Sequence, residues 1–441
     1  MSNQTHPRLL VLGLDGLPFT LAQNLSREEK LPHLARLALS PNAHPIRAEI
    51  PELSPVNWTS FYTASGPEEH GVFGFTRIDP RSYALGFADS GAVQCPTIFD
   101  RLGERGLISK VVNLPNAYPA KPLSGMLIAG FVAPDLSRAV YPWSLAESLR
   151  QAGYVLEADT TRGAGDPEYL LSELEKTLKS RETALDMLWG DLAWDLFVFV
   201  LTETDRLMHF FFPALTRKTH PLHGACMDFL KNWDRLIGQV LERYDALPEP
   251  KRLLALADHG FAELKTEVDV NAWLMREGLL RLKRAPENEL DLSAISPDSQ
   301  AFALDPGRIY VHTRDRFARG PLSQTQAREV QGRIRESLMH LTFEGEPVME
   351  RIFTREELYQ GPCFAQAPDL VCLARPGFDL KAKWNRKEVF GFFGRTGTHS
   401  ADNAFFFDTL GAEPKRVRDV GGLVLDFFGA AKQDCAGGKS F

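Results

Sequence analysis

The sequence has few cysteines and no long apolar segment. Its 441 residues include five cysteines, which are widely spaced and contain no Cys-x-x-Cys pair. An odd, scattered set of cysteines argues against a disulfide framework or a zinc ribbon and favours reduced thiols in a cytosol. The N-terminus shows no signal-peptide pattern, and the longest apolar run, residues 196–201, is far too short to span a bilayer. We therefore expect a cytoplasmic protein with no membrane partner.

The chain also lacks an excess of positive charge. It carries 50 basic and 57 acidic residues, a formal net charge of −7. Without a basic field, a nucleic-acid polymer is not the expected partner. Acidic residues gathered at one site could still hold cations. No fixed repeat and no low-complexity tract interrupts the sequence, and its length suits either two or three average domains or one large α/β domain with insertions.

Three unbroken apolar runs dominate the pattern, at residues 8–14, 196–202 and 253–257. Such runs are typical of strands buried on both faces of a parallel sheet. Each is followed within a few residues by an aspartate: Asp15, Asp205 and Asp258. Ligands of open α/β sheets bind beyond the carboxyl ends of the strands. If these strands are parallel neighbours, the three carboxylates meet at one edge, where their mutual repulsion requires cations.

Two histidines accompany these aspartates. His209 follows Asp205 by one helical turn, and His259 follows Asp258 directly. Carboxylate and imidazole are both ligands for borderline divalent ions. His259 would point away from Asp258 along an extended backbone, so the chain must turn at Gly260. Taken singly, each aspartate could cap a helix and each histidine could pack in the core; their joint pattern favours a metal site.

Residues 50–75 are irregular and rich in proline. Pro51 and Pro55 bracket Ser54 and restrict it to extended or turn geometry. A helical pattern begins at Asn57, which would place Ser54 just outside a helix N-terminus. Ser54 could be a turn residue, Thr59 or Ser60 could be the reactive hydroxyl instead, and Asn57 could cap the helix, bind phosphate or do both.

Five motifs occur in one order along the chain: Asp15-Gly16, Ser-Pro-x-Asn-Trp-Thr-Ser at 54–60 with Gly-Pro-Glu-Glu-His-Gly at 66–71, Asp205-x-x-x-His209, Asp258-His259-Gly260 and Gly397-Thr398-His399. In this order and spacing the sequence resembles the type I phosphodiesterase/nucleotide pyrophosphatase family of the alkaline phosphatase superfamily. Weaker similarities at residues 97–100, 113–115, 271–274 and 367–369 extend the resemblance over most of the chain.

The resemblance implies a three-layer α/β/α sandwich with a central, mostly parallel sheet and a smaller inserted cap or edge element. We assign residues 1–262 and 396–441 to the catalytic core and residues 263–395 to an α+β insertion. It also implies two divalent metal ions, which the ligand types suggest are zinc, with manganese as the alternative. The site residues it implies are Asp205, His209 and His399 for one ion, Asp15, Asp258, His259 and the Ser54 oxygen for the other, and Asn57 as donor to a phosphoryl oxygen. From the residues themselves we interpret His70 as support for the Ser54 loop and Trp58 as a contact to substrate, with core packing as the alternative for Trp58.

The chemistry of these residue types agrees with that set. A serine hydroxyl is a poor nucleophile until it loses its proton, and a divalent cation stabilises the alkoxide. Two ions about 4 Å apart can hold the attacking and leaving oxygens of an in-line displacement. We therefore expect hydrolysis of a small phosphodiester or nucleotide pyrophosphate through a phosphoserine at Ser54. A phosphomonoesterase, a phosphonate hydrolase and a non-catalytic metal- or nucleotide-binding protein are the alternatives.

Overall fold

The structure, a computed structural model, describes residues 6–191 and 193–430. Its largest sheet has eight strands in the order β2-β21-β9-β1-β8-β5-β6-β7. The five inner strands are mutually parallel: β9 (Lys251–Leu256), β1 (Arg8–Leu14), β8 (Leu196–Leu201), β5 (Ser109–Leu114) and β6 (Gly125–Ala129). The remaining strands pair antiparallel with their neighbours: β21 (Ala404–Asp408) with β9, β2 (Ala43–Ile46) with β21, and β7 (Val140–Tyr141) with β6. The predicted mostly parallel sheet is therefore confirmed.

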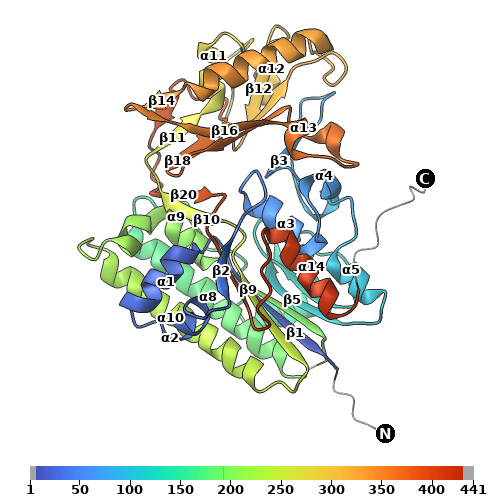
Figure 1. Ribbon diagram of the computed structural model, residues 1–441, viewed down its shortest axis with the longest axis vertical. Helices are drawn as coiled ribbons and strands as arrows, with labels where there is room; N and C mark the ends of the chain where they lie inside the picture. Colours follow the sequence, from blue (N-terminus) through green and yellow to red (C-terminus); the bar gives the residue numbers. More distant parts are fainter. Residues whose placement is uncertain (1–5, 192, 431–441) are drawn as a thin grey trace.

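Helices cover both faces of this sheet (Figure 1). The unbroken apolar runs of β1, β8 and β9 are almost fully buried, which requires a helical layer on each side. One layer contains α1 (Phe19–Glu28), α2 (Pro32–Ala38), α8 (Pro167–Trp189), α9 (Glu203–Thr216) and α10 (His223–Asp245). The other contains α3 (Ser54–Thr63), α5 (Ile98–Gly103) and α14 (Val417–Phe427). The short helices α4 (Pro67–His70), α6 (Leu136–Ala139) and α7 (Ser144–Gln151) lie in the connections.

A second hydrophobic core, which runs from Val268 to Val389 and also includes Tyr83, forms a cap above the carboxyl edge of the large sheet (Figure 1). One cap sheet contains β12 (Ala301–Leu304), β13 (Arg308–Val311), β17 (Leu370–Ala374) and β16 (Met349–Thr354). The other contains β18 (Phe378–Lys381), β11 (Thr266–Asp269) and β19 (Phe390–Gly391). The remaining cap elements are α11 (Val270–Arg276), α12 (Gln324–Met339), α13 (Arg355–Leu358), β14 (Thr342–Phe343) and β15 (Glu346–Pro347).

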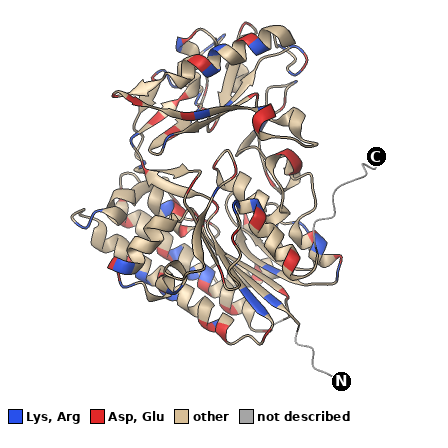
Figure 2. Ribbon diagram, viewed as in Figure 1, with Lys and Arg blue, Asp and Glu red and all other residues tan. Residues whose placement is uncertain are grey.

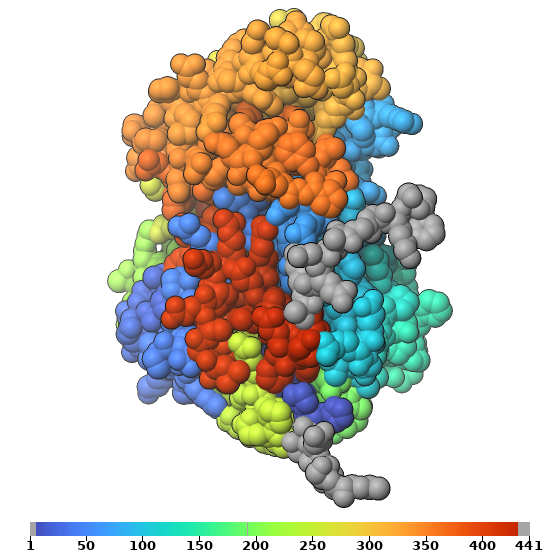
Figure 3. Space-filling view, turned by 45° about the vertical axis from the view of Figure 1, so that its right-hand side comes forward, coloured from blue at the N-terminus to red at the C-terminus, as the bar shows by residue number. Residues whose placement is uncertain are grey.

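One hairpin and one pair of strands that are distant in sequence join the core to the cap. The first, β3 (Thr76–Ile78) with β4 (Leu85–Phe87), extends from the core and buries Tyr83 in the cap. Its light-blue atoms lie against the orange cap in Figure 3. The second is β10 (Gly260–Glu263) paired with β20 (Gly397–Ser400), at the points where the chain leaves and re-enters the core. This antiparallel ladder places His399 opposite Phe261.

Charged side chains of both signs are distributed over the outer helices, while the strands of the large sheet carry few (Figure 2). None of the helices among the described residues combines the length and the hydrophobicity needed to cross a membrane. The described cysteines are free thiols, and Cys435 lies outside the described residues.

Candidate active site

The three aspartates that follow the apolar strands converge, as predicted. Strand β1 lies between β8 and β9, and their ends are level, because Leu14 pairs with Leu201 and Gly13 with Leu256. Asp15 and Asp258 follow their strands at this edge. Asp205 lies in the first turn of α9, so that His209, one turn later, has its Nε2 3.5 Å from the Asp205 Oδ1.

These residues form two adjacent groups of ligand-type atoms. Asp205, His209 and His399 each place one such atom within 4.8 Å of the others, and so do Asp15, Asp258 and His259. The groups touch, because the His259 and His399 rings stack with their centroids 3.6 Å apart. All six side chains are buried except His399, which is half-buried.

The backbone fixes the tautomer of all three histidines. The Nδ1 atoms of His209, His259 and His399 face the carbonyl oxygens of Gly397, Gly260 and Glu52 at 3.2, 3.0 and 2.9 Å. A carbonyl only accepts, so each Nδ1 carries the proton and each Nε2 presents a lone pair to the cluster. This arrangement orients imidazoles that bind metal ions.

The cluster carries lone pairs without matching donors. The Nε2 atoms of His209 and His399 are 3.1 Å apart. Burial lowers the pKa of His209 well below its ordinary value, and it also lowers the pKa of His259, so neutral rings are favoured. Two lone pairs at this separation repel each other unless a cation lies between them.

The carboxylates of the cluster also lack hydrogen-bond donors. Asp258 Oδ1 accepts the Gly16 N–H at 3.1 Å, but its Oδ2 is buried without a hydrogen-bond partner among the described residues. Burial, together with the charges of Asp258 and Asp205, raises the pKa of Asp15 well above its ordinary value. Because unpaired buried oxygens and lone pairs are costly, this donor set fits divalent cations.

Asp205 is the most strongly supported carboxylate of the cluster. Its Oδ2 accepts a hydrogen bond from Arg206 at 2.6 Å, and its Oδ1 lies 3.1 Å from the His399 Nε2. Burial alone would raise the pKa of Asp205, but interactions with His209 and His399 in their protonated forms and with the Arg206 guanidinium outweigh it and hold that pKa well below its ordinary value. When the imidazoles are neutral, Arg206 is the cation that supports this carboxylate. Asp205 is therefore an anion under ordinary conditions, as a metal ligand must be.

Ser54 is the first residue of α3, not a residue outside it as the sequence suggested; Leu53 is the N-cap. The Ser54 Oγ lies 3.2 Å from the His259 Nε2 and lines the cavity beside the ligand cluster. At this position the positive end of the α3 dipole favours negative charge on the oxygen or on a bound phosphoryl group.

Asn57 and Trp58, which the sequence predicts to contact substrate, are not among the residues that line the cavity. Both are fully buried, because α3 runs from Ser54 into the core. The Asn57 Oδ1 accepts the Glu49 N–H at 2.6 Å, and its Nδ2 donates to the Leu53 carbonyl at 3.1 Å. The Trp58 Nε1 donates to the Asp15 Oδ1 at 3.2 Å. These side chains position the Ser54 loop and a ligand-type carboxylate.

His70 supports α3, the helix that begins at Ser54. Its Nδ1 accepts the Val72 N–H at 3.1 Å, so its Nε2 carries the proton and donates to the Ser60 Oγ at 2.9 Å. Burial lowers the pKa of His70 to about 3. Ser60 in turn donates to the Val56 carbonyl at 2.8 Å, which leaves its hydroxyl directed into α3 and away from the cluster.

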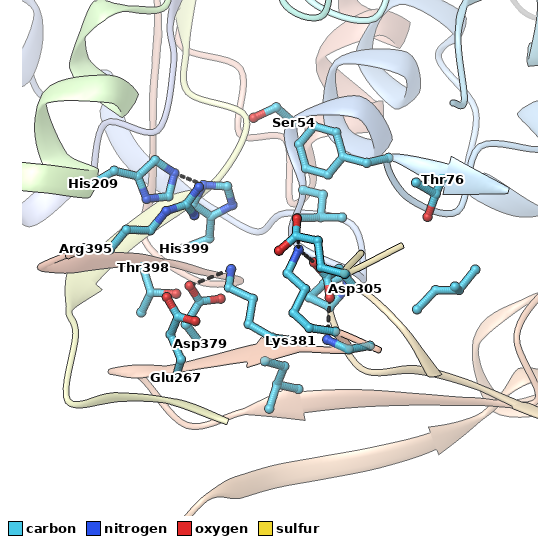
Figure 4. Close-up of a pocket in the computed structure, with 18 of the residues that line it drawn as sticks. Ser54, Thr76, His209, Glu267, Asp305, Asp379, Lys381, Arg395, Thr398 and His399 are labelled. Atoms are coloured by element: carbon cyan, nitrogen blue, oxygen red, sulfur yellow. Dashed lines mark hydrogen bonds and ion pairs between the residues drawn. The ribbon is translucent and has the colours of Figure 1, made fainter. Parts of the chain in front are cut away.

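A cavity of about 530 Å³ separates the cluster from the cap (Figure 4). Aromatic side chains form part of its wall, and Phe75 and Phe131 meet edge to face at 5.7 Å. The cap contributes cations that are each paired with a carboxylate. These pairs are Lys381 with Asp379 at 2.8 Å, Lys383 with Asp305 at 3.0 Å and Arg386 with Glu267 at 2.6 Å.

Arg395 differs from these cations. Among the described residues it has no hydrogen-bond or ion-pair partner, and it lies beside His209 and His399 (Figure 4). Its loop is anchored by the Thr396 N–H, which donates to the His209 carbonyl at 2.7 Å. The sequence gives little sign of Arg395, since the only signal is a basic residue four positions before the expected ligand His399.

The sequence model of the type I phosphodiesterase / nucleotide pyrophosphatase family matches residues 9–402. The chain belongs to this family. The type I phosphodiesterases are metal-dependent phosphoester hydrolases, and their superfamily uses two divalent metal ions, so the chain is an enzyme of that class. No curated protein sequence matches it significantly.

Solved structures of similar fold align with nearly the whole chain. Phosphonoacetate hydrolase from Sinorhizobium meliloti 1021, in complex with phosphonoformate, has a TM-score of 0.64 at 14% identity, covering 97% of this chain and 95% of that one. Alkaline phosphatase PafA has a TM-score of 0.60 at 12% identity, with coverages of 97% and 96%. An inactive variant of murine ectonucleotide pyrophosphatase/phosphodiesterase 5, in complex with AMP, has a TM-score of 0.55 at 13% identity, with coverages of 96% and 95%. These likenesses show an alkaline phosphatase-like fold.

Proposed function

We propose that the chain hydrolyses a phosphodiester or nucleotide pyrophosphate bond with Ser54 as the nucleophile. The observation that carries this proposal is the position of the Ser54 Oγ, 3.2 Å from the Nε2 of His259, a member of one ligand group whose ring stacks on His399 of the other. In a family of phosphoester hydrolases, a hydroxyl in that place is the expected nucleophile.

The ligand groups divide between two ions. Asp205, His209 and His399 would hold one, and Asp15, Asp258 and His259, with the Ser54 Oγ, would hold the other. We propose zinc, because three of the six side chains are imidazoles, with manganese as the alternative. When bound, the ions stabilise the serine alkoxide and the negative charge on the phosphoryl oxygens.

Ser54 then displaces the leaving oxygen from the phosphorus of the substrate. Its oxygen forms a bond to phosphorus as the bond to the leaving oxygen breaks, which gives a phosphoserine and a released alcohol or phosphate. Water then attacks the phosphoserine, which restores the hydroxyl and releases the second product. Leu53 and Asn57 keep the hydroxyl at the start of α3, because the Asn57 side chain bonds the backbone of Glu49 and of Leu53, the residue just before Ser54. Burial of the cluster strengthens its electrostatic interactions.

The cavity indicates the size and polarity of the substrate. A volume of about 530 Å³ falls in the range of small-molecule sites. Phe75, Phe87 and Phe131 offer an aromatic wall for a nucleobase or another planar leaving group. We therefore propose a small phosphorylated substrate, with nucleotides among the candidates.

Phosphomonoester or phosphonate hydrolysis is the second candidate. Arg395 favours it, because a guanidinium without a carboxylate partner can pair with the second negative charge that a monoester or phosphonate has and a diester lacks. The rates with a chromogenic phosphodiester, a phosphomonoester and a phosphonate, measured on one preparation, decide between the two reactions.

Ser54→Ala tests the proposed nucleophile. We expect a loss of at least about 1,000-fold in kcat, while elemental analysis still finds two metal ions per chain. Ser65→Ala is the matched control, since Ser65 lies just beyond the other end of α3 and donates to the Thr63 carbonyl. Undiminished turnover by Ser54→Ala, or full hydrolysis in excess chelator, would contradict the proposal.

A further inference from the structure

A second cavity, of about 300 Å³, lies where the β3–β4 hairpin meets the cap. Thr76 lines both this cavity and the one beside Ser54. The second cavity is lined by three arginines, Arg77, Arg308 and Arg316, and by no aspartate or glutamate. Its charge is therefore unlike that of the Ser54 cavity, where most cations face a carboxylate.

Arg308 is a buried cation without a counter-ion. Its side chain has 1% of its surface exposed, and no carboxylate among the described residues lies within ion-pair distance of it. It donates to the Asp305 carbonyl at 2.7 Å, to the Thr76 carbonyl at 2.9 Å and to the Thr76 Oγ1 at 3.2 Å. A guanidinium has five N–H groups, so two remain for another acceptor. Burying a cation without a partner anion is costly, and a bound anion would remove that cost.

The other two arginines add to the positive charge. Arg316 donates to the Ala367 and Gln366 carbonyls at 2.9 and 2.8 Å. Its carboxylate neighbour, Asp369, lies 3.4 Å away and is shared with Arg355 at 3.6 Å. Arg77, on β3, is exposed and has no partner among the described residues. The three cations together are therefore opposed by part of one carboxylate.

We propose that this cavity is a second oxyanion site, which binds phosphate either as the free ion or as the phosphomonoester group of a small molecule. A tetrahedral phosphate has enough oxygens to accept from three guanidinium groups, whereas a carboxylate has two. The anion would connect Arg77 of the hairpin to Arg308 and Arg316 of the cap. The proposal depends on neither the nucleophile nor the reaction at Ser54.

Calorimetric titration of the metal-loaded protein with inorganic phosphate tests this site. We expect two binding events, one that chelation of the metals abolishes and one that survives it. Arg77→Ala and Arg316→Met should each weaken the surviving event by about tenfold or more, as the loss of a charge-assisted hydrogen bond does, and leave the metal-dependent event unchanged. Arg328→Ala is the control, since Arg328 is an exposed arginine of α12 that does not line the cavity.

Phenyl phosphate distinguishes the two sources of the anion. Tighter binding of phenyl phosphate than of phosphate at the surviving event would identify a phosphomonoester ligand, because Phe73, Tyr310 and Phe317 line the same cavity. Equal binding would identify free phosphate. A single event that disappears with the metals, or a surviving event that is unaffected by either arginine substitution, would overturn the proposal. Because the readout is heat and not turnover, an inactive Ser54 would leave it unchanged.

Discussion

Asp258→Asn should have opposite effects on stability with and without metal ions. In the metal-free protein the Asp258 Oδ2 is buried without a donor and adds to the repulsion on Asp15. Asparagine keeps the oxygen that accepts the Gly16 N–H and replaces the other by an amide that can donate to Asp15. In the metal-loaded protein the same change removes an anionic ligand.

The two effects are large enough to measure. Relief of an unsatisfied buried charged group contributes about 1–3 kcal/mol, so the free energy of unfolding of metal-free Asp258→Asn should exceed that of the wild type by this amount. A metal ion at 100 times its Kd stabilises the native state by about 2.7 kcal/mol, and the variant should lose most of that for one ion. Since 1 kcal/mol shifts Tm by only roughly 1 °C in a chain of this length, urea unfolding followed by tryptophan fluorescence is the better assay. The measurement should be made at pH 8, because proton uptake by Asp15 at lower pH would relieve the same repulsion and reduce the stability gained by the variant.

Asp234→Asn is the matched control. Asp234 is also a buried aspartate, but its two oxygens accept the backbone N–H groups of Leu34 and His33 at 2.6 and 3.3 Å. Its amide variant loses an acceptor and should be destabilised to the same extent with and without metal. If Asp258→Asn behaved in that same way, the six side chains would not be a cation site.

Three further predictions concern residues around the cluster. Trp58→Phe removes the hydrogen bond to Asp15 and should weaken metal binding by about 10- to 100-fold, measured by competition with a chromogenic chelator; unchanged affinity would show that the bond does not orient Asp15. Arg395→Gln should reduce kcat/KM for a monoester by about tenfold or more and change that for a diester much less, with Arg386→Gln as the paired-cation control; an equal loss on both substrates would refute the charge argument. The pKa of His70 is lowered to about 3, so below pH 6.5 the unfolded chain binds a proton at His70 while the folded chain does not. The contribution of His70 to the free energy of unfolding is therefore complete above pH 6.5 and declines as the pH falls. Between pH 6.5 and 4 the stability advantage of wild type over His70→Gln should therefore shrink by about 3 kcal/mol in urea unfolding, and an advantage independent of pH would contradict the assigned neutral ring.

The core strands and their aspartates were predictable because the signal is local. An unbroken apolar run indicates a strand buried on both faces, and Asp15 and Asp258 follow such runs directly. His399 is different, since its contact with Asp205 spans 194 residues and depends on the register of β10 with β20. Only the family resemblance indicated it.

The features that the sequence did not show have an equally physical origin. The roles of Asn57 and Trp58 depend on which way the first turn of α3 faces, and that follows from where the helix starts, which the sequence placed three residues too late. Arg395 and the arginine cavity were missed because an unpaired cation is defined by its neighbours in space. The sequence shows many basic residues, and only the fold shows which of them lack a carboxylate.

The pairing of β10 with β20 also bears on how the cap could vary. Glu263 and Gly397 are register partners, so residues 264–396, which contain the cap apart from the contribution of the β3–β4 hairpin, are inserted between two residues that face each other in the β10–β20 ladder. A short turn could join β10 directly to β20 without moving His259 or His399. Relatives could therefore exchange, enlarge or delete this segment and acquire new substrates while the metal-binding geometry below it stays constant.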